Sequence, residues 1–242
     1  MAKVKRKVKK RLKNIGKFLV AVIIGVLIFE GCKYYLTSSE DLIPNNQVKD
    51  YYNISDFGFV RLTSEKDYNE NGIDDTTDIL NGERKEVENN PKYVDKYYQN
   101  GYAPEGEGVC TDTIIRAFKE AGYDLKTMIS TDIRKINKNK TYKIDLIDDN
   151  IDFRRVTNQD IFFERYAEEL TLDYTEVGEF MPGDILVFDD SSHIAMVSDK
   201  YNVKGIPFVI QNRDQMEMCI CIKKWKSLEM VNIFSYLNFF KW

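Results

Sequence analysis

Histidine is almost absent from this chain of 242 residues, which contains a single one, His193, and four cysteines. No pair of Cys-x-x-Cys motifs accompanies it, so the sequence offers too few ligands for a zinc ion. Basic residues are also fewer than acidic ones in most of the chain. Residues 1–17 hold nine Lys or Arg and no acid; removing these nine from the total of 35 leaves 26 basic against 39 acidic residues, a net charge of −13. This acidic body argues against nucleic acid as a partner.

The first 36 residues join the basic run to an apolar segment. Residues 18–29 carry no charge, and the two tyrosines that follow are typical of a membrane interface. No small-x-small cleavage site follows them. We therefore expect residues 1–17 to be a basic cytoplasmic tail and residues 18–36 to be an uncleaved signal anchor, a single transmembrane segment that exports the rest of the chain. The alternatives are a cleaved signal peptide and a lipoprotein attached through Cys32.

The exported part begins with a polar stretch, residues 37–53, which predicts a linker that holds the following domain close to the membrane. Residues 54–242 then alternate helical and strand patterns. They predict one α+β domain in which N-terminal helices pack on an antiparallel sheet of about five strands. This places the domain outside the cytoplasm, in the layer that contains cell-wall polymer.

An amphipathic helix is predicted directly after Gly108. Cys110, Ile114 and Phe118 recur at four-residue intervals on one apolar stripe, so the thiol points inward. Gly122 supplies a C-terminal stop. A cysteine in the first turn of a helix lies near free backbone N–H groups and the positive end of the helix dipole, and both favour the thiolate. Cys110 is therefore a candidate nucleophile, and the alternative is a buried structural cysteine.

The histidine lies in a predicted β-hairpin. Residues 185–197 contain two apolar strands joined by a polar loop, which puts His193 at the start of the second strand. The next predicted strand, residues 207–212, ends in the amide of Asn212. A cysteine at a helix start, with a histidine and an amide on successive strands, is the arrangement of a cysteine hydrolase. In this hypothesis His193 is the base for Cys110, and Asn212 orients the imidazole.

Four motifs follow one another through this part of the chain: Gly108-Val-Cys-Thr-Asp112, Asn150-Ile-Asp-Phe-Arg-Arg-Val156, Pro182-Gly-Asp184 leading to His193-Ile-Ala-Met-Val-Ser-Asp199, and Val209-Ile-Gln-Asn212. Their order resembles the papain-like NlpC clan of bacterial cysteine peptidases and amidases and, more narrowly, the bacterial domain of unknown function twelve-eighty-seven. The resemblance implies a papain-like fold and a triad of Cys110, His193 and Asn212. Phe153 and Gln211 stand where relatives are expected to carry histidine.

The leading hypothesis is therefore a membrane-anchored hydrolase that cleaves amide bonds in cell-wall peptides and needs no cofactor for catalysis. Two alternatives use the same residues. One is a catalytically silent module that binds the wall or assists its assembly. The other is an acyl or peptidyl transferase that works through the same triad.

A calcium loop is predicted at residues 67–78, where the spacing of oxygen-bearing residues is similar to that of an EF-hand loop, with Gly72 at the sixth position. Asp at the last position, in place of Glu, departs from the EF-hand. The loop predicts a structural calcium ion, and the alternative is a polar turn that caps a helix beginning near Thr76. The predicted ligands are Asp67, Asn69, Asn71, the carbonyl of Ile73, Asp75 and Asp78.

Three further residues are candidates for contact with a substrate. Tyr102 precedes the cysteine, and its hydroxyl is a candidate for the oxyanion site beside the N–H of Cys110. Arg154 or Arg155 is a candidate clamp for a substrate carboxylate, because a guanidinium binds carboxylates through two hydrogen bonds. The alternative for Tyr102 is packing, and for the arginines it is exposure to solvent or pairing with nearby acids.

Overall fold

The computed structural model describes residues 51–136, 140–170, 173, 177–188 and 191–213, together with the backbone of strands 216–219 and 230–235. The predicted cytoplasmic tail, the signal anchor and nearly all of the linker lie outside the described residues. In the described part of the chain, no helix has the length and apolar character needed to cross a membrane.

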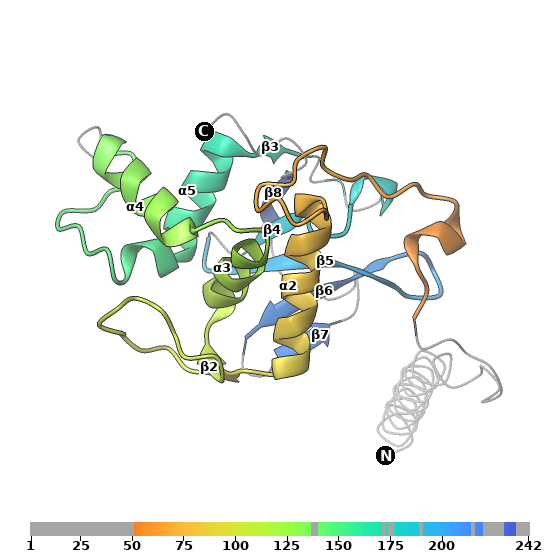
Figure 1. Ribbon diagram of the computed structural model, residues 1–242, viewed down its shortest axis with the longest axis horizontal. Helices are drawn as coiled ribbons and strands as arrows, with labels where there is room; N and C mark the ends of the chain where they lie inside the picture. Colours follow the sequence, from red (N-terminus) through yellow and green to blue (C-terminus); the bar gives the residue numbers. More distant parts are fainter. Residues whose placement is uncertain are drawn as a thin grey trace, which may run out of the picture. The chain divides into compact units, whose positions relative to one another are not determined.

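Two long helices run in opposite directions beside each other (Figure 1). Helix α2 is Asp75–Asn89, and helix α3 is Cys110–Glu120, as the apolar stripe predicted. Glycine is unfavourable in the interior of a helix, and α2 contains one at Gly82. This residue is the point of closest approach, because a Cβ atom there would lie 2.7 Å from the Cα atom of Ala117. The close packing of α2 against α3 thus requires glycine at this position, although glycine is unfavourable for the helix itself.

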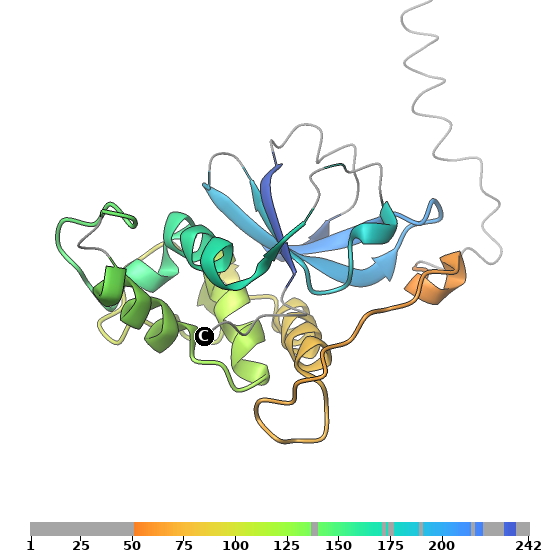
Figure 2. The same ribbon diagram turned by 90° about the horizontal axis from the view of Figure 1, so that it is seen from above.

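A six-stranded antiparallel sheet forms the second layer (Figures 1 and 2), one strand more than expected, with the strand order β3-β8-β4-β5-β6-β7. The predicted hairpin is confirmed, because Phe188 pairs with His193 across β4 and β5. A separate parallel pair, β1 and β2, lies just before α3. The strands are β1 Lys92–Tyr93, β2 Glu107–Gly108, β3 Glu168–Glu169, β4 Ile185–Phe188, β5 His193–Tyr201, β6 Pro207–Asn212, β7 Met216–Cys219 and β8 Met230–Ser235.

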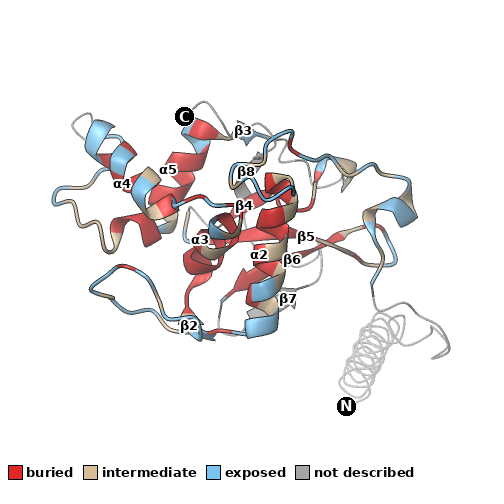
Figure 3. Ribbon diagram, viewed as in Figure 1, coloured by how far each residue is buried: buried red, intermediate tan, exposed pale blue. Residues whose placement is uncertain are grey.

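The sheet separates two cores, because successive side chains of a strand point to opposite faces. Ile185 and Ile194 belong to the larger core under the helices, which also contains Cys110. Phe188 and Val197 belong to a smaller core on the other face. Figure 2 shows the helices on one side of the sheet, and Figure 3 shows the central strands and the inner sides of α2 and α3 as buried. The mixed α+β class is therefore confirmed.

Helices α4 (Leu125–Ile136) and α5 (Val156–Tyr166) complete the helical layer. A buried carboxylate, Asp132, joins them. It accepts hydrogen bonds from the Tyr166 hydroxyl at 2.6 Å and from Arg165 Nε at 2.9 Å. Burial alone would raise the pKa of Asp132, but hydrogen bonds from Arg165 and the tyrosines outweigh it and lower the pKa.

Glu83 of α2 is fully buried, and no described residue forms a hydrogen bond with either of its carboxylate oxygens. Burial, with a contribution from the charge of Glu86, raises the pKa of Glu83 well above its usual value of 4.5. The folded protein therefore holds this carboxyl in its neutral form at pH values at which the unfolded chain ionises it.

We predict that Glu83→Gln stabilises the protein at pH 8 and leaves it nearly unchanged at pH 4.5. An acid with a raised pKa in the folded state loses stability as pH rises toward that pKa, by up to about 1.4 kcal/mol per pH unit. Urea unfolding at several pH values measures the difference. Glu88→Gln, on an exposed position of the same helix, is the control. If the free energy of unfolding depends on pH in the same way for the wild type and Glu83→Gln, the prediction is wrong.

Candidate functional site

Cys110 is the first residue of α3, and its side chain is 6% exposed. A residue of the helix itself caps its N-terminus, because Asp112 Oδ2 accepts a hydrogen bond of 2.8 Å from the backbone N–H of Val109. This bond satisfies one of the N–H groups that a helix start leaves without an intrahelical partner. The helix therefore begins at the cysteine and holds it against the sheet.

A buried ion pair fixes the same turn of the helix. Arg154 lies on the 3₁₀ turn Asp152–Arg154 and contacts Asp112 at two points, with Nε to Oδ1 and Nη2 to Oδ2 both at 2.7 Å. Both side chains are almost completely buried. Burial disfavours the charged guanidinium, but the contact with Asp112 raises the pKa of Arg154 overall. Arg154 therefore holds α3 in place and does not point outward as the predicted carboxylate clamp.

The segment around Arg154 supports α3 through its backbone as well. The Thr111 hydroxyl donates a hydrogen bond of 2.8 Å to the carbonyl of Arg154. Gln159 Nε2 donates to the carbonyl of Phe153 at 3.1 Å, and the Phe153 ring is fully buried in the main core. The motif at residues 150–156 is therefore a support beneath the cysteine helix.

The thiol itself is protonated in this environment. Burial raises the pKa of Cys110 to about 11, although backbone hydrogen bonds from Ile194 and Thr111 act in the opposite direction. This corrects the expectation that the helix start produces a thiolate. Removal of the sulfur from water outweighs the dipole and the backbone donors, so formation of the thiolate requires a proton acceptor nearby.

His193 is the first residue of β5, and its imidazole lies on the face of the sheet that holds the smaller core. Its ring stacks on Phe188, with centroids 6.1 Å apart, and its Nε2 atom lies 2.7 Å from Oε1 of Gln211. The contact with Gln211 fixes the orientation of the imidazole. Cys110 reaches the neighbouring residue, Ile194, from the opposite face.

Cys110 thus contacts Ile194 next to His193, but the thiol and the imidazole lie on opposite faces of the sheet, and no hydrogen bond joins these two described side chains. The two amides at the end of β6 also lie on opposite faces. Asn212 lies on the cysteine side, where its Nδ2 donates to the carbonyl of Gly108 at 3.4 Å. Gln211, not the predicted Asn212, contacts His193. The reason is the alternation of β6, because adjacent residues cannot face the same side. The sequence contains this information, because the alternation of side chains along β5 and β6 predicts which of the two amides shares a face of the sheet with His193.

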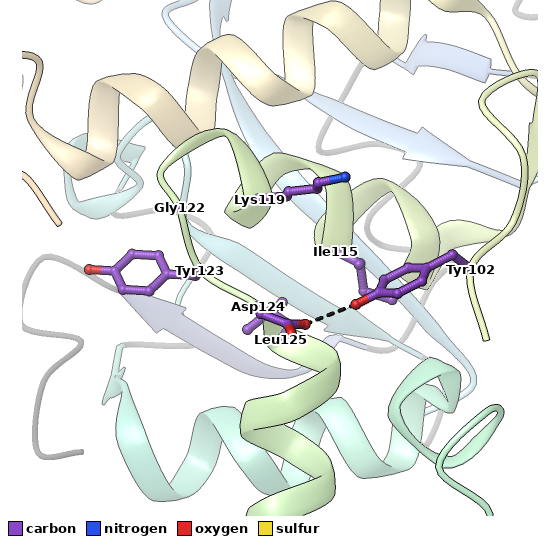
Figure 4. Close-up of a pocket in the computed structure, with 7 residues that line it drawn as sticks. All are labelled: Tyr102, Ile115, Lys119, Gly122, Tyr123, Asp124 and Leu125. Carbon is purple, nitrogen blue, oxygen red and sulfur yellow. Dashed lines mark hydrogen bonds between the residues drawn. The ribbon is translucent and has the colours of Figure 1, made fainter. Parts of the chain in front are cut away.

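The other substrate candidates lie apart from Cys110. The Tyr102 hydroxyl donates a hydrogen bond of 2.9 Å to Asp124 at the start of α4 (Figure 4), so it is engaged there and not at an oxyanion site. Burial and the bond to Asp124 raise the pKa of Tyr102. The side chain of Arg155 is 58% exposed and lies 3.4 Å from Asp152. Arg155 therefore pairs with a local acid, as the alternative reading held.

The predicted calcium loop precedes α2, and its side chains converge in part. Asp67 accepts hydrogen bonds from the backbone N–H of Asn71 at 3.0 Å and of Gly72 at 2.7 Å. Asp78 accepts from the Asn71 amide at 2.7 Å. Asp75 is turned away, because its carboxylate accepts from the Tyr123 hydroxyl and from a backbone N–H. The described residues contain no group of three or more acidic, histidine or cysteine side chains arranged to hold a metal ion.

Comparison with known proteins places this fold and site in a family. The family described as "Domain of unknown function (DUF1287)" matches residues 80–228, a range that contains Cys110, Arg154, His193 and Asn212. The chain belongs to this family. It is also 31% identical over 143 residues to "Uncharacterized protein YijF" of Escherichia coli (strain K12), a match that covers 55% of this chain and 69% of that protein. No solved structure matches the chain.

We predict that Arg154→Met lowers the free energy of unfolding by about 3–5 kcal/mol, because it leaves the Asp112 carboxylate buried without its partner. Urea unfolding measures the loss. The adjacent Arg155→Met is the matched control and should change stability by no more than about 0.5 kcal/mol. The double variant Asp112→Leu/Arg154→Met should lose less than the sum of the single variants. A stable Arg154→Met protein with weakened substrate binding would instead support the clamp.

Proposed function

We propose that this protein is a papain-like cysteine hydrolase of the NlpC type that acts outside the cytoplasm on amide bonds of cell-wall peptides, anchored through residues 18–36. The observation that carries the proposal is the position of the thiol. Cys110 receives a backbone hydrogen bond from Ile194, the residue that follows the only histidine of the chain. A nucleophile and a base on adjoining elements, with the base oriented by a third group, is the general arrangement of such hydrolases.

The reaction begins with proton transfer from the Cys110 thiol to the imidazole of His193, a step that requires the ring to turn away from Gln211 and toward the cysteine face of the sheet. The thiolate attacks the substrate carbonyl carbon, and the backbone N–H groups at the start of α3 receive the negative charge on its oxygen. The imidazolium then protonates the leaving amine, which departs as the thioester forms. Water deprotonated by His193 hydrolyses the thioester and restores the thiol.

Gln211 has a positioning role in this scheme. Its Oε1 atom lies 2.7 Å from Nε2 of His193, so it orients the resting imidazole before the ring turns toward the thiol. Asn212 acts on the other partner, because its amide contacts the carbonyl of Gly108, two residues before the nucleophile. The two amides would thus orient the base and the nucleophile separately.

A second candidate function is favoured by the burial of the thiol. Cys110 is 6% exposed and its pKa is raised to about 11, which are the properties of a structural cysteine. In this alternative the domain binds the wall or assists its assembly without catalysis. A transferase on the same residues differs only in the acceptor of the thioester, an amine in place of water.

We predict that Cys110→Ala and His193→Ala each abolish cleavage of wall-derived peptides by the full-length protein, because each removes a group that reacts. Gln211→Leu should lower kcat by about 10- to 100-fold with little change in KM, because it affects only the orientation of the base. Chromatography of the released peptides measures the rates, and addition of an amine acceptor separates transfer from hydrolysis.

Two controls accompany this experiment. Circular dichroism and thermal unfolding of each variant show whether the fold is retained. Alkylation of Cys110 in the substrate-free wild type should be slow at pH 8 and accelerate about tenfold per pH unit toward pH 11, as the raised pKa requires. Cleavage that persists in Cys110→Ala would rule out Cys110 as the nucleophile, whereas a folded wild type that cleaves no wall-derived peptide would favour the silent module.

We also propose that the loop at residues 67–78 binds a structural calcium ion, supported by the EF-hand-like spacing and by the contacts that Asp67 and Asp78 each make with Asn71. Calcium at about 10 mM, well above the dissociation constants of weak extracellular sites, should raise Tm by several degrees. Asp67→Asn retains the shape of the side chain and should remove most of the rise. Magnesium is the ionic control, and an equal rise with Asp67→Asn would contradict the proposal.

A further inference from the structure

A groove of about 430 Å³ lies at the turn between α3 and α4, apart from the cysteine (Figure 4). Its size is within the range of cavities that bind small ligands. It lies toward the C-terminal end of α3, whereas Cys110 lies at the N-terminal end. Lys119 follows Cys110 by nine positions along this helix. The lining residues are Tyr102, Ile115, Lys119, Gly122, Tyr123, Asp124 and Leu125.

The groove is preformed and partly apolar. The accessible apolar surface comes from the ring of Tyr102, which is 40% exposed, whereas Ile115 and Leu125 are only 4% and 0% exposed. Tyr102 is held on one side by its hydrogen bond to Asp124 at 2.9 Å and by an edge contact with Phe153, whose ring centroid lies 5.6 Å away. A ligand with an apolar group could therefore enter without reordering the walls, which lowers the entropic cost of binding.

The two charged groups in the groove differ in how far they are engaged. Asp124 caps α4, accepting from the hydroxyl of Thr127 at 2.6 Å and from the hydroxyl of Tyr102. Burial opposes its ionisation, but these hydrogen bonds lower the pKa of Asp124 overall. Lys119 is exposed, and no acid among the described residues forms an ion pair with it. The groove therefore offers, among the described residues, one cation without an ion-pair partner and one exposed aromatic ring.

We propose that this groove binds the carboxylate end of a peptide whose last side chain is small and apolar, with the carboxylate on Lys119 and the side chain against the exposed ring of Tyr102. A single ammonium suits a carboxylate, whereas phosphate sites generally combine arginine forks or several backbone N–H groups. This inference rests on the proposed function, because it names the peptide end of the substrate that the hydrolase would hold away from Cys110.

The test uses the full-length protein with Cys110→Ala, so that no turnover occurs, and ligand-detected NMR titrations. The probes are N-acetyl-alanyl-alanine and the same dipeptide with an amidated end. The free acid should bind about two- to fivefold more tightly than the amide, as expected for one exposed ion pair. Lys119→Met should erase this preference, and Lys204→Met, which removes an exposed lysine of the β5–β6 turn, should retain it.

A second variant tests the apolar part of the groove. Tyr102→Ala removes one wall, so it should weaken acid and amide alike while the preference for the acid persists. Equal binding of acid and amide by the parent protein, or a preference that survives Lys119→Met, would overturn the inference. Hydrolysis by the wild type is measured separately. If the acid is not preferred but hydrolysis occurs, only the groove proposal is wrong. If the acid is preferred but no hydrolysis occurs, only the hydrolase proposal is wrong.

Discussion

The buried ion pair between Asp112 and Arg154 is the contact on which the surroundings of Cys110 depend. Its two charges leave water, a cost that is recovered only when every donor and acceptor finds a partner. Asp112 meets this requirement by closing its own helix at Val109, and Arg154 meets it partly through the carbonyl of Lys96 at 3.0 Å. Three segments distant in sequence must therefore arrive together, and the position of the nucleophile follows from their meeting.

The same burial that fixes Cys110 also decides its chemistry. Charge interactions at a helix terminus contribute about 0.3–1 kcal/mol. The rise of the thiol pKa from 9.0 to about 11 corresponds to about 3 kcal/mol in favour of the protonated form. Desolvation therefore dominates. In the hydrolase that we propose, the reactivity of the thiol depends on the approach of His193 and not on the helix alone, which would confine the reactive form to the complex with substrate.

Local patterns in the sequence predicted the elements that carry the site, because periodicity and turn residues act over a few positions. The helix from Cys110, the hairpin that begins β5 at His193 and the strand that ends at Asn212 all follow from such patterns. Long-range contacts were not predictable in this way. The burial of Arg154 depends on Asp112, 42 residues away, and the fit of Gly82 depends on Ala117. Asp75 was assigned to calcium by spacing, but Tyr123 occupies its carboxylate.

Strand β6 makes contacts on both faces of the sheet. Gln211 contacts His193 on one face, and its neighbour Asn212 contacts the carbonyl of Gly108, before Cys110, on the other. The assignment of these amides is thus a property of the strand register, not of the residues themselves. One residue inserted into the turn before Pro207, if absorbed by sliding β6, would move Gln211 to the cysteine side and place Ile210 beside His193, without altering any side chain. Homologous chains with identical motifs can therefore differ in the residue of β6 that contacts the histidine, and the length of this turn distinguishes them.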